Sequence, residues 1–246
     1  MHPLELFEQE KKERLTRQGQ DEALKKAAER FMAESLRACY SYNFSWLGRP
    51  IIQYPEDVMA LQEIIWRVRP RLIIETGVAH GGSVIMSASL LEMLGGDGHV
   101  LGLDIDIREH NRPLIENHPL ARRLTLLEKN SLDQEAAALA ARMAEEKKGG
   151  PVMVILDSMH THQHVLGEMR LYGPLVTPGS YLVVFDGIIE NHPETNAPDR
   201  PWGPGNSPLS AIREFLAEDD SFVVDEEIEN KLLITAAPSG YLRRVK

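Results

Sequence analysis

The stretch that decides the fold is LIIETGVAHGGS, residues 72–83. Its first three residues are apolar and predict a short buried strand. A helix follows from Ser83 to Leu94, and two glycines end it. The glycines between strand and helix let a ligand approach the backbone closely at the strand end. This unit predicts a cofactor-binding turn, and the alternative is a tight turn without a ligand.

Strands and helices alternate on either side of this unit. Helices are expected over residues 55–69, 133–147, 162–171 and 207–216, and further strands over 100–103, 124–127, 152–156, 181–185, 222–224 and 232–235. Such alternation favours an α/β fold in which helices cover both faces of a parallel sheet. We predict a doubly wound, mostly parallel seven-stranded sheet whose last two strands form a hairpin-like pair at the edge.

The N-terminal segment reads as a helical extension, because residues 5–38 are rich in good helix formers. Leu24, Ala28, Phe31 and Ser35 follow helical spacing, which predicts one packed face. The polar first half has little apolar surface to bury and is expected to lie on a neighbouring subunit of a homo-oligomer. An ordered aromatic loop follows over residues 40–50. We therefore divide the chain into an arm (residues 1–50) and a main domain (51–246).

Composition narrows the class of protein. The chain has 246 residues, of which 43% are hydrophobic, enough for one domain with an appendage. Its net charge of −10 disfavours nucleic acid as a partner. No apolar run approaches the roughly 20 residues of a membrane span, and the charged start does not resemble a secretory signal. A single cysteine, Cys39, excludes an internal disulfide, so we expect a cytoplasmic protein.

Polar residues follow the predicted strands at the ends where parallel sheets bind ligands. They are Glu75-Thr76-Gly77, Asp104, Asn130-Ser131, Asp157 and Asp186. The turn lacks the G-x-G-x-x-G spacing of dinucleotide sites. Glu75, just before the turn, suits a ligand that carries an ammonium group, such as S-adenosylmethionine (SAM). Asp104, at the end of the next strand, suits the ribose diol of that ligand. The sequence therefore predicts a SAM site.

Two aspartates are candidates for a metal site. Asp157 and Asp186 end neighbouring strands, which lie about 4.8 Å apart in a sheet. Carboxylates at that distance repel unless a cation or a proton separates them, and oxygen ligands suit magnesium or calcium. The alternative is that both acids cap turns. His160 and His162 follow directly; either is a candidate base for a hydroxyl, or a solvent-facing residue of a helix start. The long segment 186–207 is expected to be a lid or binding loop.

Four motifs together resemble a known family. They are YSYNFSWLGRPIIQYPEDVMALQEIIW (residues 40–66), IIETGVAHGGS (73–83), LGLDID (101–106) and ILDSMHTH (155–162). The combination is similar to the cephalosporin hydroxylase/rhamnosyl O-methyltransferase family. The resemblance implies a class I SAM-dependent methyltransferase fold, often with bound magnesium, and relatives that methylate sugar hydroxyls in lipids and natural products.

The resemblance also implies roles for individual residues. The methionine end of SAM would be surrounded by Glu75, Thr76, Gly77, Ala79 and Ser83, with Gln53 and Asp157 beside the cofactor, Asp104 at the ribose, and Asn130 and Ser131 at the adenine. In the family the fifth strand ends in two acids, whereas this chain has Phe185 before Asp186. One metal ligand is therefore missing, and His160, Glu190, Asn191 or His192 could replace it.

We therefore predict a SAM-dependent, magnesium-assisted O-methyltransferase that acts on a sugar or a glycosylated natural product or lipid. Asp157, His160 and Asp186 are its candidate catalytic residues, and Asp157 and Asp186 its candidate metal ligands. Two alternatives remain open at this point: a cofactor-binding accessory protein of a cephalosporin-hydroxylase-like pathway, and a metal-independent methyltransferase.

Overall fold

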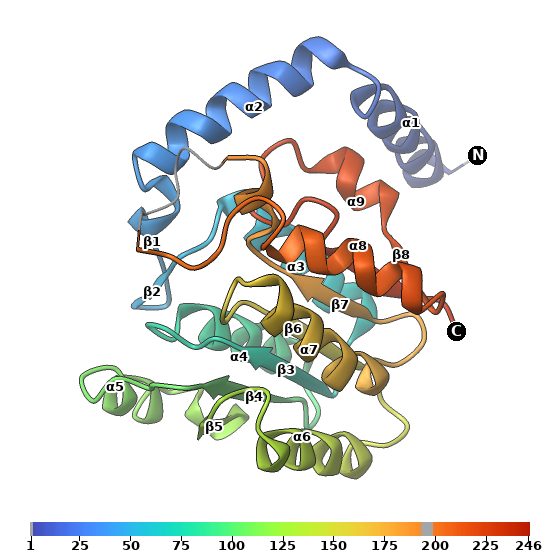
Figure 1. Cartoon of the computed structure of the whole chain (residues 1–246). Coiled ribbons are helices and arrows are strands. Elements are labelled where there is room, and N and C mark those ends of the chain that lie inside the picture. The colour runs from blue at the N-terminus through green and yellow to red at the C-terminus, as the bar shows by residue number, and fades with distance from the viewer. Residues whose placement is uncertain (1, 193–198) are drawn as a thin grey trace.

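A seven-stranded sheet forms the centre of the protein (Figure 1). In this computed structural model, residues 2–192 and 199–246 are described. The strand order is β5-β4-β3-β6-β7-β9-β8, and only β9 runs antiparallel to its neighbours. The strands are β3 (Leu72–Thr76), β4 (His99–Asp104), β5 (Leu124–Glu128), β6 (Val152–Leu156), β7 (Tyr181–Val184), β8 (Phe222–Val224) and β9 (Tyr241–Arg244). The predicted α/β fold with a mostly parallel sheet is confirmed.

Helices cover both faces of the sheet, and the side chains of β3 show why. Ile73 points to one face and packs with α3 (Pro55–Val68) and α4 (Gly82–Leu94). Leu72 and Ile74 point to the other, toward α6 (Gln134–Glu146), α7 (His162–Tyr172) and α8 (Pro208–Glu218). Because both faces are buried, the strand is a continuous apolar run rather than an alternating one. Its polar end, where the chain leaves the sheet, lies at the sheet's carboxyl edge.

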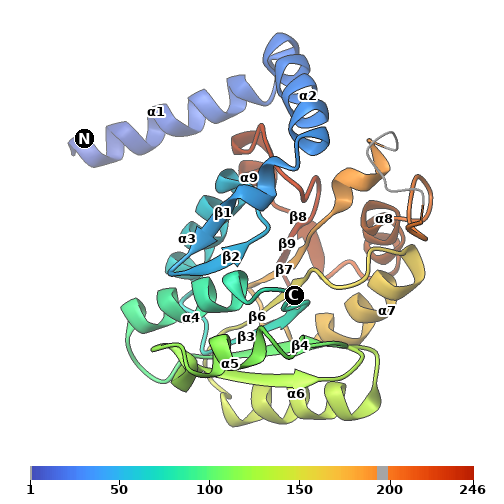
Figure 2. The same ribbon diagram turned by 90° about the vertical axis from the view of Figure 1, so that its left-hand side faces the viewer.

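The N-terminal extension consists of α1 (Pro3–Gln18) and α2 (Glu22–Arg37), and α1 projects from the body of the molecule (Figure 2). The Asp21 side chain caps α2. The Gln18 amide ties the end of α1 to the carbonyl oxygens of Asn230 and Lys231, each at 2.9 Å. The packed face of α2 is rotated from the predicted one: Met32 and Ser35 are buried, whereas Phe31 is exposed. α1 itself buries no residue.

The aromatic segment is more regular than expected. After a 3₁₀ turn (Tyr40–Asn43), β1 (Phe44–Trp46) and β2 (Arg49–Ile51) form an antiparallel hairpin. Leu47 and Gly48 join its strands with φ of 45° and 85°, as the two central residues of a type I′ turn require. β2 contains residue 50, the predicted boundary between the arm and the main domain.

The predicted strand over residues 232–235 is wrong. The Asp57 carboxylate accepts hydrogen bonds from the Thr235 hydroxyl and from the Ala236 N–H at 2.8 Å, so a side chain rather than a neighbouring strand holds this segment. The last strand of the sheet is β9. Two short helices had no predicted counterpart, α5 (Arg112–Glu116) and α9 (Glu226–Lys231).

The long segment after β7 is partly ordered by local contacts. A 3₁₀ turn, η4 (Gly187–Glu190), begins directly after Asp186, and Gly203 and Asn206 form an isolated bridge. Pro193 and Pro198 of the predicted binding loop lie outside the described residues. Within the described residues, no helix is both long enough and apolar enough to cross a membrane.

Candidate active site

The glycine turn after β3 is shaped by close packing. Gly77 has a φ of 90°, and a Cβ there would lie 2.0 Å from the carbonyl oxygen of Asp157. A Cβ on Gly82 would lie 2.2 Å from the carbonyl oxygen of Pro50. No L side chain fits at either contact without moving backbone atoms. The glycines thus bring the turn against both the end of β6 and the β1–β2 hairpin.

Asp104, at the end of β4, holds this turn in place. Its Oδ2 accepts hydrogen bonds from the N–H groups of Val78 at 2.8 Å and Ala79 at 3.1 Å, and Oδ1 accepts one from the N–H of Asp106 at 3.0 Å. The sequence predicted Asp104 as the ribose ligand. The structure places it beside the turn as expected and shows that it also orders the turn's backbone.

Glu75 and Thr76 are buried where β3 meets the turn. Burial raises the pKa of the Glu75 carboxyl to about 7, partly offset by hydrogen bonds from Ser83 and Ser87. The Thr76 hydroxyl is buried and has no hydrogen-bond partner among the described residues. A buried hydroxyl without a partner is costly, so Thr76 has unused capacity to bind a ligand.

Gln53 links the glycine turn to the next strand end. Its Nε2 donates a hydrogen bond to Asp157 Oδ2 at 2.9 Å, while its Oε1 is buried without a partner in the described part of the chain. A cavity of about 40 Å³ lies here, between residues 50–53, the turn and Asp157. Five of the predicted cofactor residues line it: Gln53, Gly77, Ala79, Ser83 and Asp157. The structure therefore brings these residues together, although it does not test their cofactor contacts.

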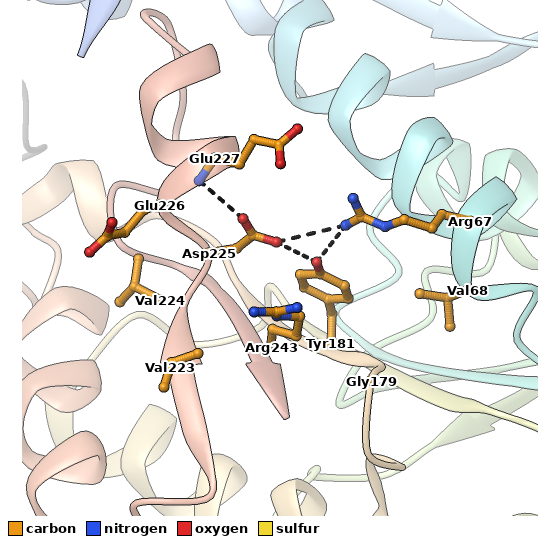
Figure 3. A pocket seen from close by; sticks show the side chains of 10 residues that line it. All are labelled: Arg67, Val68, Gly179, Tyr181, Val223, Val224, Asp225, Glu226, Glu227 and Arg243. Carbon is orange, nitrogen blue, oxygen red and sulfur yellow. Dashed lines mark hydrogen bonds and ion pairs between the residues drawn. The ribbon is translucent and has the colours of Figure 1, made fainter. Parts of the chain in front are cut away.

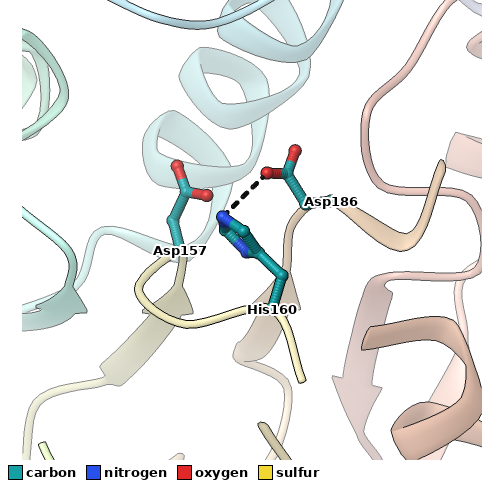
Figure 4. Close-up of side chains that lie close together, drawn as sticks. All are labelled: Asp157, His160 and Asp186. Atoms are coloured by element: carbon teal, nitrogen blue, oxygen red, sulfur yellow. Dashed lines mark ion pairs between the residues drawn. The ribbon is translucent and has the colours of Figure 1, made fainter. Parts of the chain in front are cut away.

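Asp157, His160 and Asp186 form a second cluster next to this cavity (Figure 4). One potential ligand atom from each lies within 4.8 Å of the other two. His160 Nε2 is 3.1 Å from Asp186 Oδ2. Asp186 follows β7 in the left-handed conformation, with φ of 58°. Burial and the nearby charge of Asp186 raise the pKa of Asp157, which is the effect expected of two acids that share a site without a cation.

An aromatic side chain from a distant segment, Trp202, contacts this cluster. The Trp202 ring meets the His160 ring edge-on, and the Arg200 guanidinium lies 5.0 Å from the centroid of the Trp202 ring. Tyr42, from the turn before the hairpin, is close enough that Asp186 contributes to raising its pKa, after the larger effect of burial. The described end of the predicted binding loop thus reaches the metal-site candidates.

Three predicted candidates take other roles in the described structure. Asn130 Oδ1 accepts a hydrogen bond from the Leu132 N–H at 2.9 Å, and Ser131 Oγ lies 3.0 Å from His164 Nε2. His162 bridges helices, with Nδ1 2.8 Å from Ser210 Oγ and Nε2 3.0 Å from Glu214. His162 is therefore not a base in this geometry. Adenine contacts of Asn130 and Ser131 stay a prediction.

A buried network was not predicted. Glu168 is fully buried on α7 and accepts a hydrogen bond from the Ser158 hydroxyl at 2.7 Å. His164 lies 3.4 Å from Glu168 and also contacts Ser131. The network holds the residue directly after Asp157 and joins it to the end of β5. Helical spacing of His164 and Glu168 was the available signal, but it does not reveal which face is buried.

Another cavity, of about 590 Å³, lies at the opposite edge of the sheet (Figure 3). Tyr181, the first residue of β7, lines it, whereas Asp186 follows the other end of that strand. Arg67 and Asp225 meet at the Tyr181 hydroxyl, which accepts from Arg67 and donates to Asp225. This network joins α3, β7 and the start of α9, and it takes no part in the candidate active site.

Sequence comparison places the chain in a family. A sequence model described as Rhamnosyl O-methyltransferase/CmcI matches residues 38–245. The chain belongs to this family. It is accordingly a SAM-dependent O-methyltransferase, as the four sequence motifs indicated. The match begins after α2, so most of the N-terminal extension lies outside it.

Individual relatives agree with this family. A Rhamnosyl O-methyltransferase of Mycobacterium tuberculosis is 33% identical over 224 residues, covering 87% of this chain and 85% of the relative. One of Mycobacterium leprae is 31% identical over 220 residues, covering 87% and 90%. A solved structure of CmcI, described with Mg and SAM, has a TM-score of 0.60 at 21% identity over 83% of this chain and 78% of that one. At that identity, the likeness confirms the family's fold.

Proposed function

We propose that this enzyme transfers the SAM methyl group to a hydroxyl of a sugar-bearing acceptor, assisted by a divalent cation held by Asp157, His160 and Asp186. The observation that carries the proposal is the hydrogen bond from Gln53 to Asp157. Asp157 lines the cavity beside the glycine turn and also belongs to the metal-site candidate, so the two sites share this residue. A methyl donor and a metal-bound acceptor would therefore meet at Asp157.

The residues beside the glycine turn fit SAM. The unpartnered Gln53 Oε1 and Thr76 Oγ1 are acceptors available to a ligand's ammonium or hydroxyl groups. Asp104 stands at the strand end where a ribose diol would lie. Ligand pockets usually measure about 300–1,000 Å³, so the 40 Å³ cavity must widen. Residues 50–53 line one side of it and the glycine turn lines another.

The metal-site candidate fits a divalent cation that accepts oxygen and imidazole ligands. Phe185, which stands where the resemblance implies an acid, is buried and packs on Tyr241 with ring centroids 6.4 Å apart. His160 faces Asp186 and so supplies a third donor atom. Of the substitutes considered from the sequence, Glu190 binds Ser207 and the Gly205 N–H instead. We therefore propose His160 as the replacement.

Each part of the site has a distinct task in methyl transfer. SAM supplies the methyl group, and a bound cation lowers the pKa of a coordinated acceptor hydroxyl. Asp157 and Asp186 orient the acceptor side of the site, and Gln53 fixes the Asp157 carboxylate relative to the cofactor side. The Trp202 ring packs against the His160 ring and helps to exclude water. Rhamnosyl groups, which the mycobacterial relatives are named for, are the acceptor sugars to test first.

Asp186→Asn tests the proposal directly. The variant should lose methyl transfer to rhamnosides by at least 100-fold while it binds S-adenosylhomocysteine with unchanged affinity, measured by calorimetry. Chelation should produce the same loss in the wild type, and added Mg²⁺ should restore only the wild type. Asp220→Asn, at a carboxylate beyond α8 with 85% of its side chain exposed, is a matched control. A wild type that stays fully active after exhaustive chelation would indicate a metal-independent methyltransferase.

A further inference from the structure

We propose that the cleft between α2 and residues 232–238 binds the apolar aglycone of the acceptor glycoside. This inference rests on the proposed function and names the kind of acceptor that the site accepts. The occupant is an uncharged apolar group, such as an alkyl or aryl chain attached to the sugar. The walls of the cleft, its place in the fold and its charges carry the proposal.

The cleft has the size and lining of a small-molecule site. Its volume of about 640 Å³ lies within the range of about 300–1,000 Å³ that is usual for ligand pockets. Apolar side chains line both of its sides: Ala28, Met32, Ile188, Leu232, Leu233 and Pro238. Met32 is almost fully buried, with 3% of its surface exposed. Burying an alkyl chain against such walls is favourable by about 0.8 kcal/mol for each methylene group.

The cleft begins close to the metal-site candidate. Ile188 lines it and belongs to η4, the 3₁₀ turn that starts directly after Asp186. Asp186 precedes this turn and Ile188 is its second residue, so the two are only two positions apart in the chain. A sugar hydroxyl at Asp186 would therefore leave the substituent of that sugar near Ile188.

The charges at the cleft disfavour an anionic occupant. Glu229 accepts hydrogen bonds from the Ser239 N–H at 3.0 and 3.2 Å, so its carboxylate is engaged within the protein. Lys25, at the rim, pairs with Glu22 at 3.3 Å. The Gln18 side-chain amide donates a hydrogen bond to the backbone carbonyl oxygen of Asn230 at 2.9 Å. Together with the exposed Glu29 carboxylate at the same cleft, these contacts disfavour an anionic ligand.

One wall comes from a part of the chain that the family model does not match. Ala28 and Met32 lie on α2, whereas the match covers residues 38–245. Ile188 and Leu232, across the cleft, lie within the matched region. The matched domain thus supplies the proposed reaction centre and one wall, and the N-terminal extension supplies the other. Such a division gives the arm a role in choosing the acceptor.

Ala28→Trp tests the cleft because the added indole would fill it. The probes are octyl α-rhamnoside and methyl α-rhamnoside, which share the sugar but differ in the aglycone. Calorimetry with protein saturated by S-adenosylhomocysteine and Mg²⁺ should show at least ten-fold weaker binding of the octyl glycoside to Ala28→Trp. Affinity for the methyl glycoside should not change. Ala27→Trp, on the exposed face of α2, is the matched control and should behave as the wild type.

Leu233→Gln provides a second test if the larger side chain disturbs folding, and it should also weaken only octyl glycoside binding. Equal octyl glycoside affinity in wild type and both cleft variants overturns the proposal. A change from dimer to monomer in Ala28→Trp, with glycoside affinity unchanged, would assign the cleft to a second copy of the chain and also overturns it. Because binding is measured without turnover, absence of methyl transfer to either glycoside would contradict the proposed function separately.

Discussion

The indole ring of Trp202 meets the imidazole ring of His160 edge-on, with ring centroids 4.8 Å apart and planes at 80°. The two residues are 42 positions apart in sequence and come from the loop after β7 and the turn after β6. This contact fixes the plane of the imidazole whose Nε2 faces Asp186. The orientation of a proposed metal ligand therefore depends on the loop.

Trp202→Ala should weaken Mg²⁺ binding by about 2- to 12-fold, because an aromatic pair contributes about 0.5–1.5 kcal/mol. Calorimetric titration of the metal measures this without turnover. Trp202→Phe keeps a ring edge and should restore most of the affinity. Trp66→Ala removes an exposed tryptophan from α3 and serves as the control. Identical metal affinity in the Ala and Phe variants would argue against positioning by the ring.

Gln53→Leu should weaken S-adenosylhomocysteine binding by at least ten-fold, or about 1.4 kcal/mol. The side chain keeps its approximate size but loses both the unpartnered Oε1 and the hydrogen bond to Asp157. Asp104→Ala should cause a loss at least as large, because the glycine turn also loses its acceptor for the Val78 and Ala79 N–H groups. Calorimetry gives both values, and undiminished affinity in either variant contradicts that residue's assignment.

Glu75 should make stability fall as pH rises from about 4.5 to about 7. Its pKa is raised from an ordinary 4.5 to about 7 in the folded protein, so in this window only the unfolded state loses the proton. The difference corresponds to about 3 kcal/mol at 1.36 kcal/mol per pKa unit. Glu75→Gln does not titrate, so relative to the wild type it should gain about that much stability between pH 4 and pH 8. Urea unfolding in the presence of a chelator measures it, and a pH-independent difference would refute the buried titration.

The arm should take part in self-association. α1 buries no residue, and Leu4 and Phe7 expose 68% and 54% of their surfaces. We predict a dimer or larger assembly in light scattering, and a shift toward monomer for the double variant Leu4→Glu/Phe7→Glu. Glu8→Gln and Glu13→Gln, on the same helix, should leave the mass unchanged. A wild type that is monomeric at high concentration would show that these side chains have no partner copy.

The sequence predicted the centre of the fold well because β3 and β6 are short apolar runs bounded by turn signals. It failed at residues 232–235, where a run with strand composition is held by Asp57, 178 positions from Thr235. No local pattern contains that contact. The start of α9 could have been predicted from the sequence, since Asp225 caps it and acids fill its first turn. The β1–β2 turn could not have been predicted, because Leu47-Gly48 lacks the usual Asn-Gly signal.

The candidate site was predicted in part for a related reason. Parallel strand ends meet at one edge, so the proximity of Asp157 and Asp186 follows from topology alone. The choice of His160 over His162 does not, because it depends on which side of a turn each ring faces. The role of Glu168 could not be predicted either, since no local sequence pattern shows that its carboxyl is buried beside Ser158. Contacts between elements, rather than within them, decide these roles.

The missing side chain of Gly77 has a consequence for how this enzyme can vary. The carbonyl oxygen of Asp157 occupies the place where a Cβ would be, at 2.0 Å. Any substitution there would push the glycine turn away from the end of β6, and these are the segments on which the proposed donor and acceptor sites lie. In the proposed site, Gly77 would thus set the distance between the methyl donor and the acceptor hydroxyl. Changes in acceptor choice can accumulate in the arm, whereas this spacing must be inherited intact.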